Sequence, residues 1–386
     1  MPQSNQPNIS TPQMPHEMAA HWDRRLLYGL GAVALVATAA ALFWFKPVQA
    51  PVTVEPKVIG IVEFPQQLDA KVGFKDAMEK LGYVEGESVI YEERQVVAGA
   101  TMFEDIDAAL TELIEDDVDL LWLSLEHQSK AAVNLTAKIG RTDVPIVFLS
   151  HFHDPVEFGI IQSYRSSGNN ATGVTTDMNE IVQRTLEFFR SMDPSITVIG
   201  VFGEGFSVPP IGGAVLKTLK ETAPRMGFEL KEYTSTVPPP EAEAEFNRVA
   251  ASIQNGDIDA LFHIAGHHYV TQERGESDLA IRLGIPMFSP FEDLPNGGQF
   301  SYSDEFGVSA AQSATMVDKI FKGTMPSDIP VEYGSKTVLT LVLDRAEAAG
   351  TVFPQGMYFL AENIFESWQD FPVRWVPPEE QDKIQN

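Results

Sequence analysis

The sequence predicts an α/β protein with two lobes, each built around a parallel β-sheet, preceded by one segment that can cross a membrane. Three observations lead to this prediction. The chain has 386 residues, which is longer than a typical domain with a single hydrophobic core. From about residue 57, short β-branched runs alternate with amphipathic helical stretches, as in βαβ units, and this rhythm restarts after residue 174. A long uncharged run precedes the first expected strand.

Composition excludes several classes of protein. Hydrophobic residues make up 44% of the chain and charged residues 21%, which excludes general disorder and a multispanning membrane protein. The 27 Lys and Arg residues face 54 Asp and Glu residues, and the net charge of -27 repels phosphates, so no nucleic-acid partner is expected. Because the chain has no cysteine, disulfides, thiolate metal sites and a cysteine nucleophile are excluded.

The N-terminal region carries the membrane segment. Leu26 to Phe45 are uncharged and follow Arg24 and Arg25. At about 1.5 Å per residue this run spans roughly 30 Å, the thickness of the hydrocarbon core. The positive-inside rule then keeps residues 1–22 in the cytoplasm as a tail and makes residues 23–46 a transmembrane anchor or uncleaved signal.

A cleaved signal peptide is the alternative, because Val48-Gln49-Ala50 is an acceptable cleavage site. Either alternative exports everything beyond the linker at residues 47–56. The expected location is the inner (cytoplasmic) membrane, crossed once, with the main domain in the periplasm or extracellular space.

The first lobe begins with a β-branched run that predicts a buried strand. The next stretch predicts a helix, with Phe74, Ala77 and Met78 on one face and Gly82 at its end. The strands expected in this lobe cover residues 57–62, 89–93, 119–125 and 145–149. The helices expected between them cover residues 69–81, about 103–114 and a stretch starting near 129.

The second lobe repeats the order of elements without repeating residues. Its expected helices cover residues 180–192, 211–226, about 241–253 and about 270–283. Its expected strands cover residues 197–202, 229–234, 259–264 and 286–289.

Several short motifs resemble one family. Gly73-Phe74 followed by Leu81 to Gly86 resembles a signature of ABC-transporter substrate-binding proteins of the tryptophan/tyrosine-binding type. Asn170 to Val174 and the pair Ile320–Gly323 and Pro326–Glu332 occur in that family's order. The resemblance covers about residues 57–355.

The resemblance implies the type I periplasmic-binding fold, in which two doubly wound parallel-sheet lobes are joined by a hinge that the chain crosses several times. Residues 57–174 and about 300–325 are then expected in the first lobe. Residues 175–299 and about 326–360 are expected in the second lobe, and residues 361–386 form a C-terminal extension.

The expected ligand site lies beyond the carboxyl ends of the strands, where open α/β sheets bind ligands. Six of the eight histidines fall at or near such strand ends. The candidate ligand-binding residues are Phe64, Gln66, Glu126, His127, Gln128, Ser129, His151, His153, Glu204, Phe206, Ser207, His267, His268, Tyr269 and Glu292.

Each residue type has a functional and a structural interpretation. Neutral imidazoles can bind a carboxylate or a metal, or they simply occur in polar loops. Phe64, Phe206 and Tyr269 stack on an aromatic or apolar solute, or they pack in a core. Glu126, Glu204 and Glu292 bind a ligand ammonium, or they are solvated carboxylates.

Catalysis is not expected, because no phosphate-binding loop, nucleophile elbow or dinucleotide motif is present. His151-Phe152-His153-Asp154 resembles part of a metallo-hydrolase motif, yet no further ligands follow at a set spacing. We therefore expect no catalytic residues, no cofactor and no metal. A metal-dependent enzyme remains an alternative.

The resemblance implies an extracytoplasmic solute-binding protein that traps an amino acid or related small carboxylate between its lobes and presents it to an ABC permease. A membrane-tethered sensor that serves a signalling partner is the alternative. Glu126–Gln128 and Gly266–Tyr269 stand where the family commonly has smaller, uncharged residues, which argues against an aromatic amino acid as the ligand.

Overall fold

The computed structural model describes residues 55–64, 68–97, 101–204, 211–235, 241–264, 273–290, 294 and 297–370. The expected cytoplasmic tail, membrane segment and most of the linker lie outside these residues. Within the described ranges, no helix is both long enough and apolar enough to span a bilayer.

The first sheet is parallel, with the strand order β11-β5-β4-β3-β1-β2. Its strands are β1 (Lys57–Glu63), β2 (Val89–Gln95), β3 (Leu120–Leu123), β4 (Ile146–Ser150), β5 (Ala171–Thr175) and β11 (Glu332–Tyr333). Every residue of β3, β4 and β5 is buried. These strands are continuous apolar or small-residue runs because helices cover both faces of the sheet.

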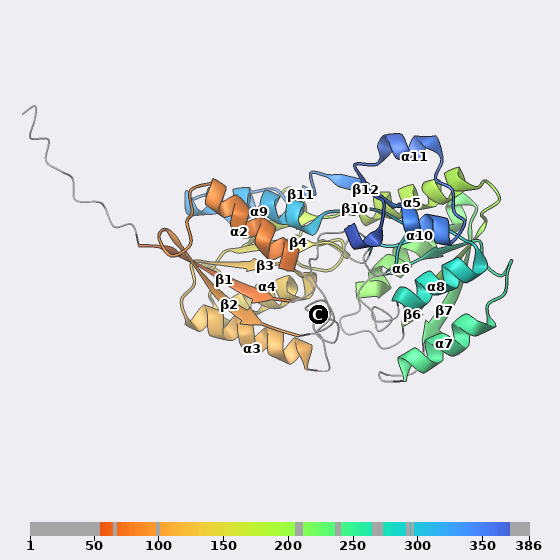
Figure 1. Ribbon diagram of the computed structural model, residues 1–386. Coiled ribbons are helices and arrows are strands. Elements are labelled where there is room, and N and C mark those ends of the chain that lie inside the picture. Colours follow the sequence, from red (N-terminus) through yellow and green to blue (C-terminus); the bar gives the residue numbers. More distant parts are fainter. Residues whose placement is uncertain are drawn as a thin grey trace, which may run out of the picture. The chain divides into compact units, whose positions relative to one another are not determined.

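Two pairs of helices cover the first sheet (Figure 1). One face carries α2 (Leu68–Lys80) and α9 (Phe306–Phe321), and the other carries α3 (Met102–Glu115) and α4 (Glu126–Ile139). Under α2 and α9, Phe74 stacks on Trp122 with ring centroids 4.4 Å apart, and the Trp122 indole donates to the Ser313 hydroxyl at 2.9 Å. Gly73 allows α2 to approach the backbone of α9 closely, since a Cβ there would lie 2.2 Å from the Gly307 oxygen.

The second sheet has the order β13-β12-β10-β9-β8-β6-β7, and its one antiparallel pair joins β10 to β12. Its strands are β6 (Val198–Glu204), β7 (Glu229–Ser235), β8 (Ala260–Phe262), β9 (Met287–Phe288), β10 (Phe300–Asp304), β12 (Thr337–Val342) and β13 (Asn363–Phe365). The α/β architecture with parallel sheets agrees with the prediction from the sequence.

Helices also cover both faces of the second sheet. The side chains of α5 (Met178–Met192) and α6 (Ile211–Thr222) enter one core, and those of α7 (Ala242–Ser252) and α8 (Glu273–Leu283) enter the other. The remaining short helices are α10 (Leu343–Ala348), α11 (Gln355–Leu360) and the 3₁₀ turns η2 (Pro224–Met226), η5 (Pro326–Asp328) and η6 (Trp368–Asp370).

The chain passes between the two sheets three times: after β5, between β10 and α9, and between β11 and β12. The returning segment therefore differs from the expected limits of about 300–325. Phe300–Asp304 pairs in the second sheet and Glu332–Tyr333 in the first, so residues 326–333 belong with the first sheet. Which sheet a short segment joins depends on the distant strand with which it pairs. The sequence of a five-residue segment does not show which strand that is.

The expected C-terminal extension also begins inside the fold. Asn363–Phe365 forms the edge strand β13, paired in parallel with β12. The backbone and hydroxyl of Ser367 and the backbone of Trp368 then bond to carboxylates, and Trp368 stacks with Arg345 at 5.0 Å. Residues 371–386 lie outside the described part of the chain.

Candidate functional site

Glu126 lies at the carboxyl edge of the first sheet, as the first residue of α4, just after β3. Its side chain is fully buried, and its Oε1 accepts backbone N–H bonds from Phe152 and, at 3.1 Å, from His153. Burial alone would raise the pKa of Glu126. The nearby His153 ring and the backbone donors outweigh burial and lower this pKa to about 2, so the carboxylate is ionised at neutral pH.

Three histidines surround this carboxylate. His153 Nδ1 lies 3.8 Å from Glu126 Oε1, and the His153 ring packs on Phe158 with centroids 4.3 Å apart. The His127 ring packs on the same Phe158 at 4.9 Å. Burial lowers the pKa of His127 to about 4, so this imidazole is neutral at physiological pH. The edge of the sheet thus carries one buried negative charge among imidazoles.

His151, the third of these histidines, belongs to a hydrogen-bond chain. The Thr176 hydroxyl donates to Asp304 Oδ2 at 2.8 Å, so its oxygen is free to accept from His151 Nδ1, 3.3 Å away. This assigns the Nδ1–H tautomer to His151 and leaves Nε2 as an acceptor. Burial lowers the pKa of His151 to about 4, and the nearby Glu126 charge opposes that shift only in part.

Asp304 connects all three passages between the sheets. It ends β10, and its two carboxylate oxygens accept from Thr176, which follows β5, and from Thr337, which begins β12, at 2.8 and 2.9 Å. Burial raises the pKa of Asp304, and the two hydroxyl donors oppose this rise. The three crossing strands are thereby held together by one carboxylate.

A cavity of about 40 Å³ lies beside His151. It is lined from both sheets, by His151, Phe152, Thr176, Met178, Ile181, Val215, Phe262, His263, Phe288, Pro290, Ser303, Asp304 and Phe306. The His151 ring stacks on Phe306 with centroids 3.9 Å apart. Phe152 packs against the cores of both sheets. Aromatic and aliphatic side chains with a few polar groups are typical of a site for a small organic ligand.

His263 and Glu276 form a second buried pair beside the cavity. His263 Nδ1 lies 3.3 Å from Glu276 Oε2, and both side chains are fully enclosed. His263 follows β8, and Glu276 belongs to α8. His263 thereby places a polar group on the part of the cavity wall that the second sheet supplies.

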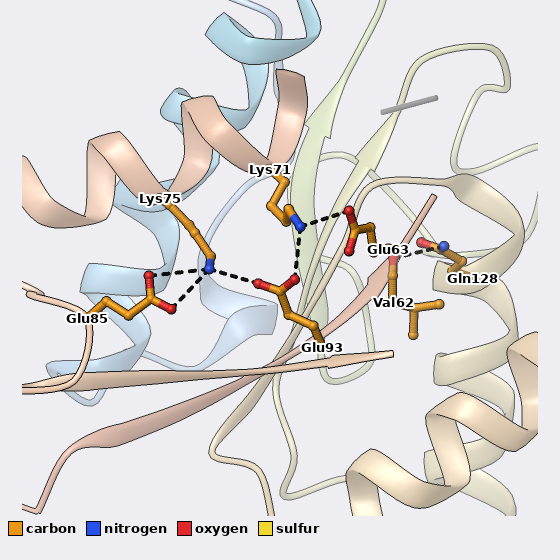
Figure 2. Close-up of polar contacts among 7 residues, drawn as sticks. All are labelled: Val62, Glu63, Lys71, Lys75, Glu85, Glu93 and Gln128. Atoms are coloured by element: carbon orange, nitrogen blue, oxygen red, sulfur yellow. Dashed lines mark hydrogen bonds and ion pairs between the residues drawn. The ribbon is translucent and has the colours of Figure 1, made fainter. Parts of the chain in front are cut away.

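A charged cluster ties α2 to the edge of the first sheet (Figure 2). Lys71 bridges Glu63 and Glu93 at 2.8 and 2.9 Å, and Lys75 bridges Glu93 and Glu85 at 2.8 and 3.2 Å. Partial burial would lower the pKa of Lys71, yet the two carboxylates raise it above its usual value. Each carboxylate of this cluster therefore forms an ion pair with a lysine, whereas the ion-pair partner of Glu126 is His153.

Three other expected residues make contacts within the fold. Phe64 is 5% exposed and packs in the core under α3, in agreement with the packing interpretation. The Gln128 amide nitrogen donates to the Val62 carbonyl at 3.1 Å (Figure 2). The Ser129 hydroxyl donates to the Leu125 carbonyl at 2.8 Å, within its own helix. These contacts position the end of β1 and the start of α4.

The remaining expected residues stay predictions. Seven of them lie outside the described residues: Gln66, Phe206, Ser207, His267, His268, Tyr269 and Glu292. Glu204 ends β6, and its side chain is likewise outside them. The expectation that no metal binds also stays open, although no group of three His, Asp or Glu side chains in the described ranges is arranged to hold one.

The structure adds residues that the sequence did not indicate. Thr176, Asp304, Thr337 and Phe306 all follow or begin crossing strands. The strand-end rule could have found two of them, because Thr176 comes directly after β5 and Asp304 is the last residue of β10. The sequence pattern does not indicate a strand at Phe300–Asp304, so it does not place Asp304 at a strand end.

Comparison with known proteins places this architecture in a family. A family model described as ABC transporter substrate binding protein matches residues 55–363. The chain belongs to this family. The resemblance seen in the sequence is confirmed, and the fold of this substrate-binding protein is the type I periplasmic-binding fold.

Named relatives agree with the assignment. The chain is 24% identical, over 76% of its length and 80% of the relative's, to a tyrosine-binding protein of Clostridioides difficile (strain R20291). A conserved domain protein from Vibrio cholerae has a similar structure, with a TM-score of 0.66, 18% identity, and coverage of 80% of this chain and 100% of the other. An ABC domain from Streptococcus pneumonia in complex with L-Trp gives a TM-score of 0.65 at 16% identity, with coverage of 81% and 100%. The first of these is named as a binding protein, and the third was solved with L-Trp bound.

Proposed function

We propose that this substrate-binding protein traps a small solute between its two lobes and presents it to an ABC permease. One observation carries the proposal: the cavity beside His151 is lined by side chains from both sheets. A solute held there touches both lobes at once, so its binding free energy favours their closure. Closure is a signal that a membrane partner can recognise.

The class of solute follows from the lining and the relatives. Phe152, Phe288 and Phe306 offer an apolar surface, and His151 offers a polar group. The relatives named above include a tyrosine-binding protein and a structure with bound L-Trp. We take an amino acid or related small carboxylate as the ligand. The cavity of about 40 Å³ is much smaller than a typical ligand pocket, so the lobes must separate to admit it.

The family and the sequence support the proposed position in the cell. Substrate-binding proteins of this family are extracytoplasmic. Residues 23–46 then serve as a single-pass anchor in the inner membrane, with Arg24 and Arg25 on the cytoplasmic side. Protease treatment of spheroplasts tests this: the main domain is digested, and a tag on residues 1–22 is protected. Digestion of that tag in intact spheroplasts contradicts the anchor.

Ligand-dependent melting tests the function. The purified full chain, kept in detergent, is heated with each of the amino acids and a set of small carboxylates. A solute at 100 times its Kd stabilises the folded state by about 2.7 kcal/mol, which raises Tm by several degrees. If no compound in the panel raises Tm, the proposed function is wrong.

A pair of variants ties any binding to the cavity. Phe306→Ala removes a ring that lines it, and Phe359→Ala removes a ring that is 80% exposed on α11. The first change is expected to weaken binding at least about tenfold, because the solute loses an apolar contact. The second change leaves the affinity unchanged. Equal affinities in the two variants would place the solute elsewhere.

A further inference from the structure

Buried polar atoms without a hydrogen-bond partner gather at the carboxyl edge of the first sheet. In the described part of the chain these atoms are Glu126 Oε2, His127 Nδ1, Gln128 Oε1, His151 Nε2 and His153 Nδ1. They come from the first turn of α4, which follows β3, and from the loop that follows β4. A buried polar group without a partner is costly, so such a concentration needs a reason beyond folding.

Glu126 is the centre of this group. Its Oε1 is satisfied by two backbone N–H groups, while its Oε2 is enclosed and has no partner. Its one ion-pair contact within the described ranges is His153, at 3.8 Å. The carboxylates of Glu63 and Glu93 differ, since each forms an ion pair with Lys71, at 2.8 and 2.9 Å (Figure 2). Glu126 is thus an ionised buried carboxylate with one oxygen that has no hydrogen-bond partner in the described residues.

Three of these unpartnered atoms, on Glu126, His151 and Gln128, can be identified as hydrogen-bond acceptors. An ionised carboxylate oxygen such as Glu126 Oε2 can only accept. His151 donates through Nδ1 to Thr176, whose own proton points at Asp304, so His151 Nε2 offers a lone pair. Gln128 donates its amide nitrogen to the Val62 carbonyl, which leaves its Oε1 as an acceptor. The missing partner is therefore a group with several N–H donors and a positive charge.

We propose that Glu126 and His151 form a subsite for the ammonium group of the solute. The inference rests on the proposed function and narrows it to solutes that carry an amino group next to an apolar body. Glu126 supplies the charge, His151 supplies an acceptor, and the rings of Phe152 and Phe306, which contact His151, receive the apolar body. A carboxylate without an amino group is repelled by the charge of Glu126 and has no positive group to place there.

Matched sets of three compounds test the subsite. Tyrosine, tyramine and 3-(4-hydroxyphenyl)propanoate form one set, and the corresponding compounds of tryptophan and leucine form two more. Calorimetric titration of the full chain is expected to show that the deaminated acid of any set that binds is at least about 100-fold weaker than its amino acid, because the charged hydrogen bonds are lost. A deaminated acid that binds as tightly as its amino acid overturns the subsite and leaves the solute-binding function standing. Where the melting panel identifies another amino acid, that compound and its deaminated acid replace these sets. If the panel identifies no solute, both proposals are wrong.

A conservative variant tests the role of Glu126 directly. Glu126→Gln keeps an oxygen for the N–H groups of Phe152 and His153 but replaces the free acceptor with a donor. The affinity for the amino-bearing compound is expected to fall about 100-fold, while binding of the deaminated acid does not weaken. Glu115→Gln, on the exposed end of α3, is the matched control and binds like wild type. Undiminished amine affinity in a folded Glu126→Gln protein contradicts the proposal, and the selectivity of the wild-type chain decides the question if that variant does not fold.

Discussion

Acid is expected to destabilise this protein through His151. The imidazole is enclosed, and burial lowers its pKa from the ordinary 6.5 to about 4. Between these two values the unfolded chain binds a proton that the folded chain does not, so the free energy of unfolding falls as the pH falls. Above pH 6.5 neither state is protonated at this site, and the full stability is present.

The magnitude follows from the size of the pKa shift. The folded-state pKa of about 4 lies about 2.5 units below 6.5, and each unit is worth about 1.36 kcal/mol, so the complete effect is about 3 kcal/mol. At pH 5 the unfolded chain is almost fully protonated and the folded chain is almost fully neutral. About 2 kcal/mol is therefore already lost at pH 5.

Urea denaturation of wild type and His151→Asn at pH 7 and pH 5 measures this effect. Asparagine keeps a donor for the Thr176 oxygen but does not titrate. The other ionisable groups are common to both proteins, so their contributions cancel in the comparison. Wild type is expected to lose about 2 kcal/mol more than the variant between the two pH values. The same loss in both proteins would show that His151 is not a buried neutral imidazole.

Further predictions concern packing and the crossing strands. Asp304→Ala removes two hydrogen bonds from the crossing strands, and urea denaturation is expected to show a loss of about 3 kcal/mol, whereas exposed Asp107→Ala changes little. A loss below about 1 kcal/mol for Asp304→Ala would mean that these bonds do not hold the crossings together. Gly73→Ala places a Cβ 2.2 Å from a backbone oxygen of α9, so a loss above about 2 kcal/mol is expected, while Gly356→Ala, with open space around it, is neutral or slightly stabilising. Equal Tm values for the two alanine variants would contradict the close contact of α2 with α9.

The fold could be predicted largely because its inner strands are local signals. Ile146–Ser150 is a continuous buried run next to a helix of clear period, and such a run indicates a parallel strand without knowledge of its neighbours. Glu332–Tyr333 is a strand only because it pairs with β5, more than 150 positions earlier. Phe300–Asp304 contains three polar residues and depends on pairing with β9 and β12. Pattern alone could not assign these segments.

The site could be predicted to a similar extent. The rule that ligands lie beyond strand ends located Glu126, His151 and His153, which the structure brings together. The rule could not show which way a side chain points, and Ser129 follows the same strand but bonds to its own helix. Asp304 was missed because its role depends on three crossing strands that meet only in the folded chain.

Two buried carboxylates show how hydrogen bonding within the fold distinguishes a structural group from a functional one. Both oxygens of Asp304 accept hydroxyl hydrogen bonds from neighbouring strands, so its desolvation is offset within the fold. Glu126 is more deeply buried, yet only one of its oxygens has partners. Because replacing Asp304 breaks bonds that exist without solute, its loss should lower the stability of the free protein. Because the free oxygen of Glu126 gains its partner only from solute, Glu126→Gln should lower the affinity for solute in addition to the stability that the ionised carboxylate gives the free protein. Measuring Tm without solute and Kd for the same two variants separates these roles, and equal effects on both quantities would remove the distinction.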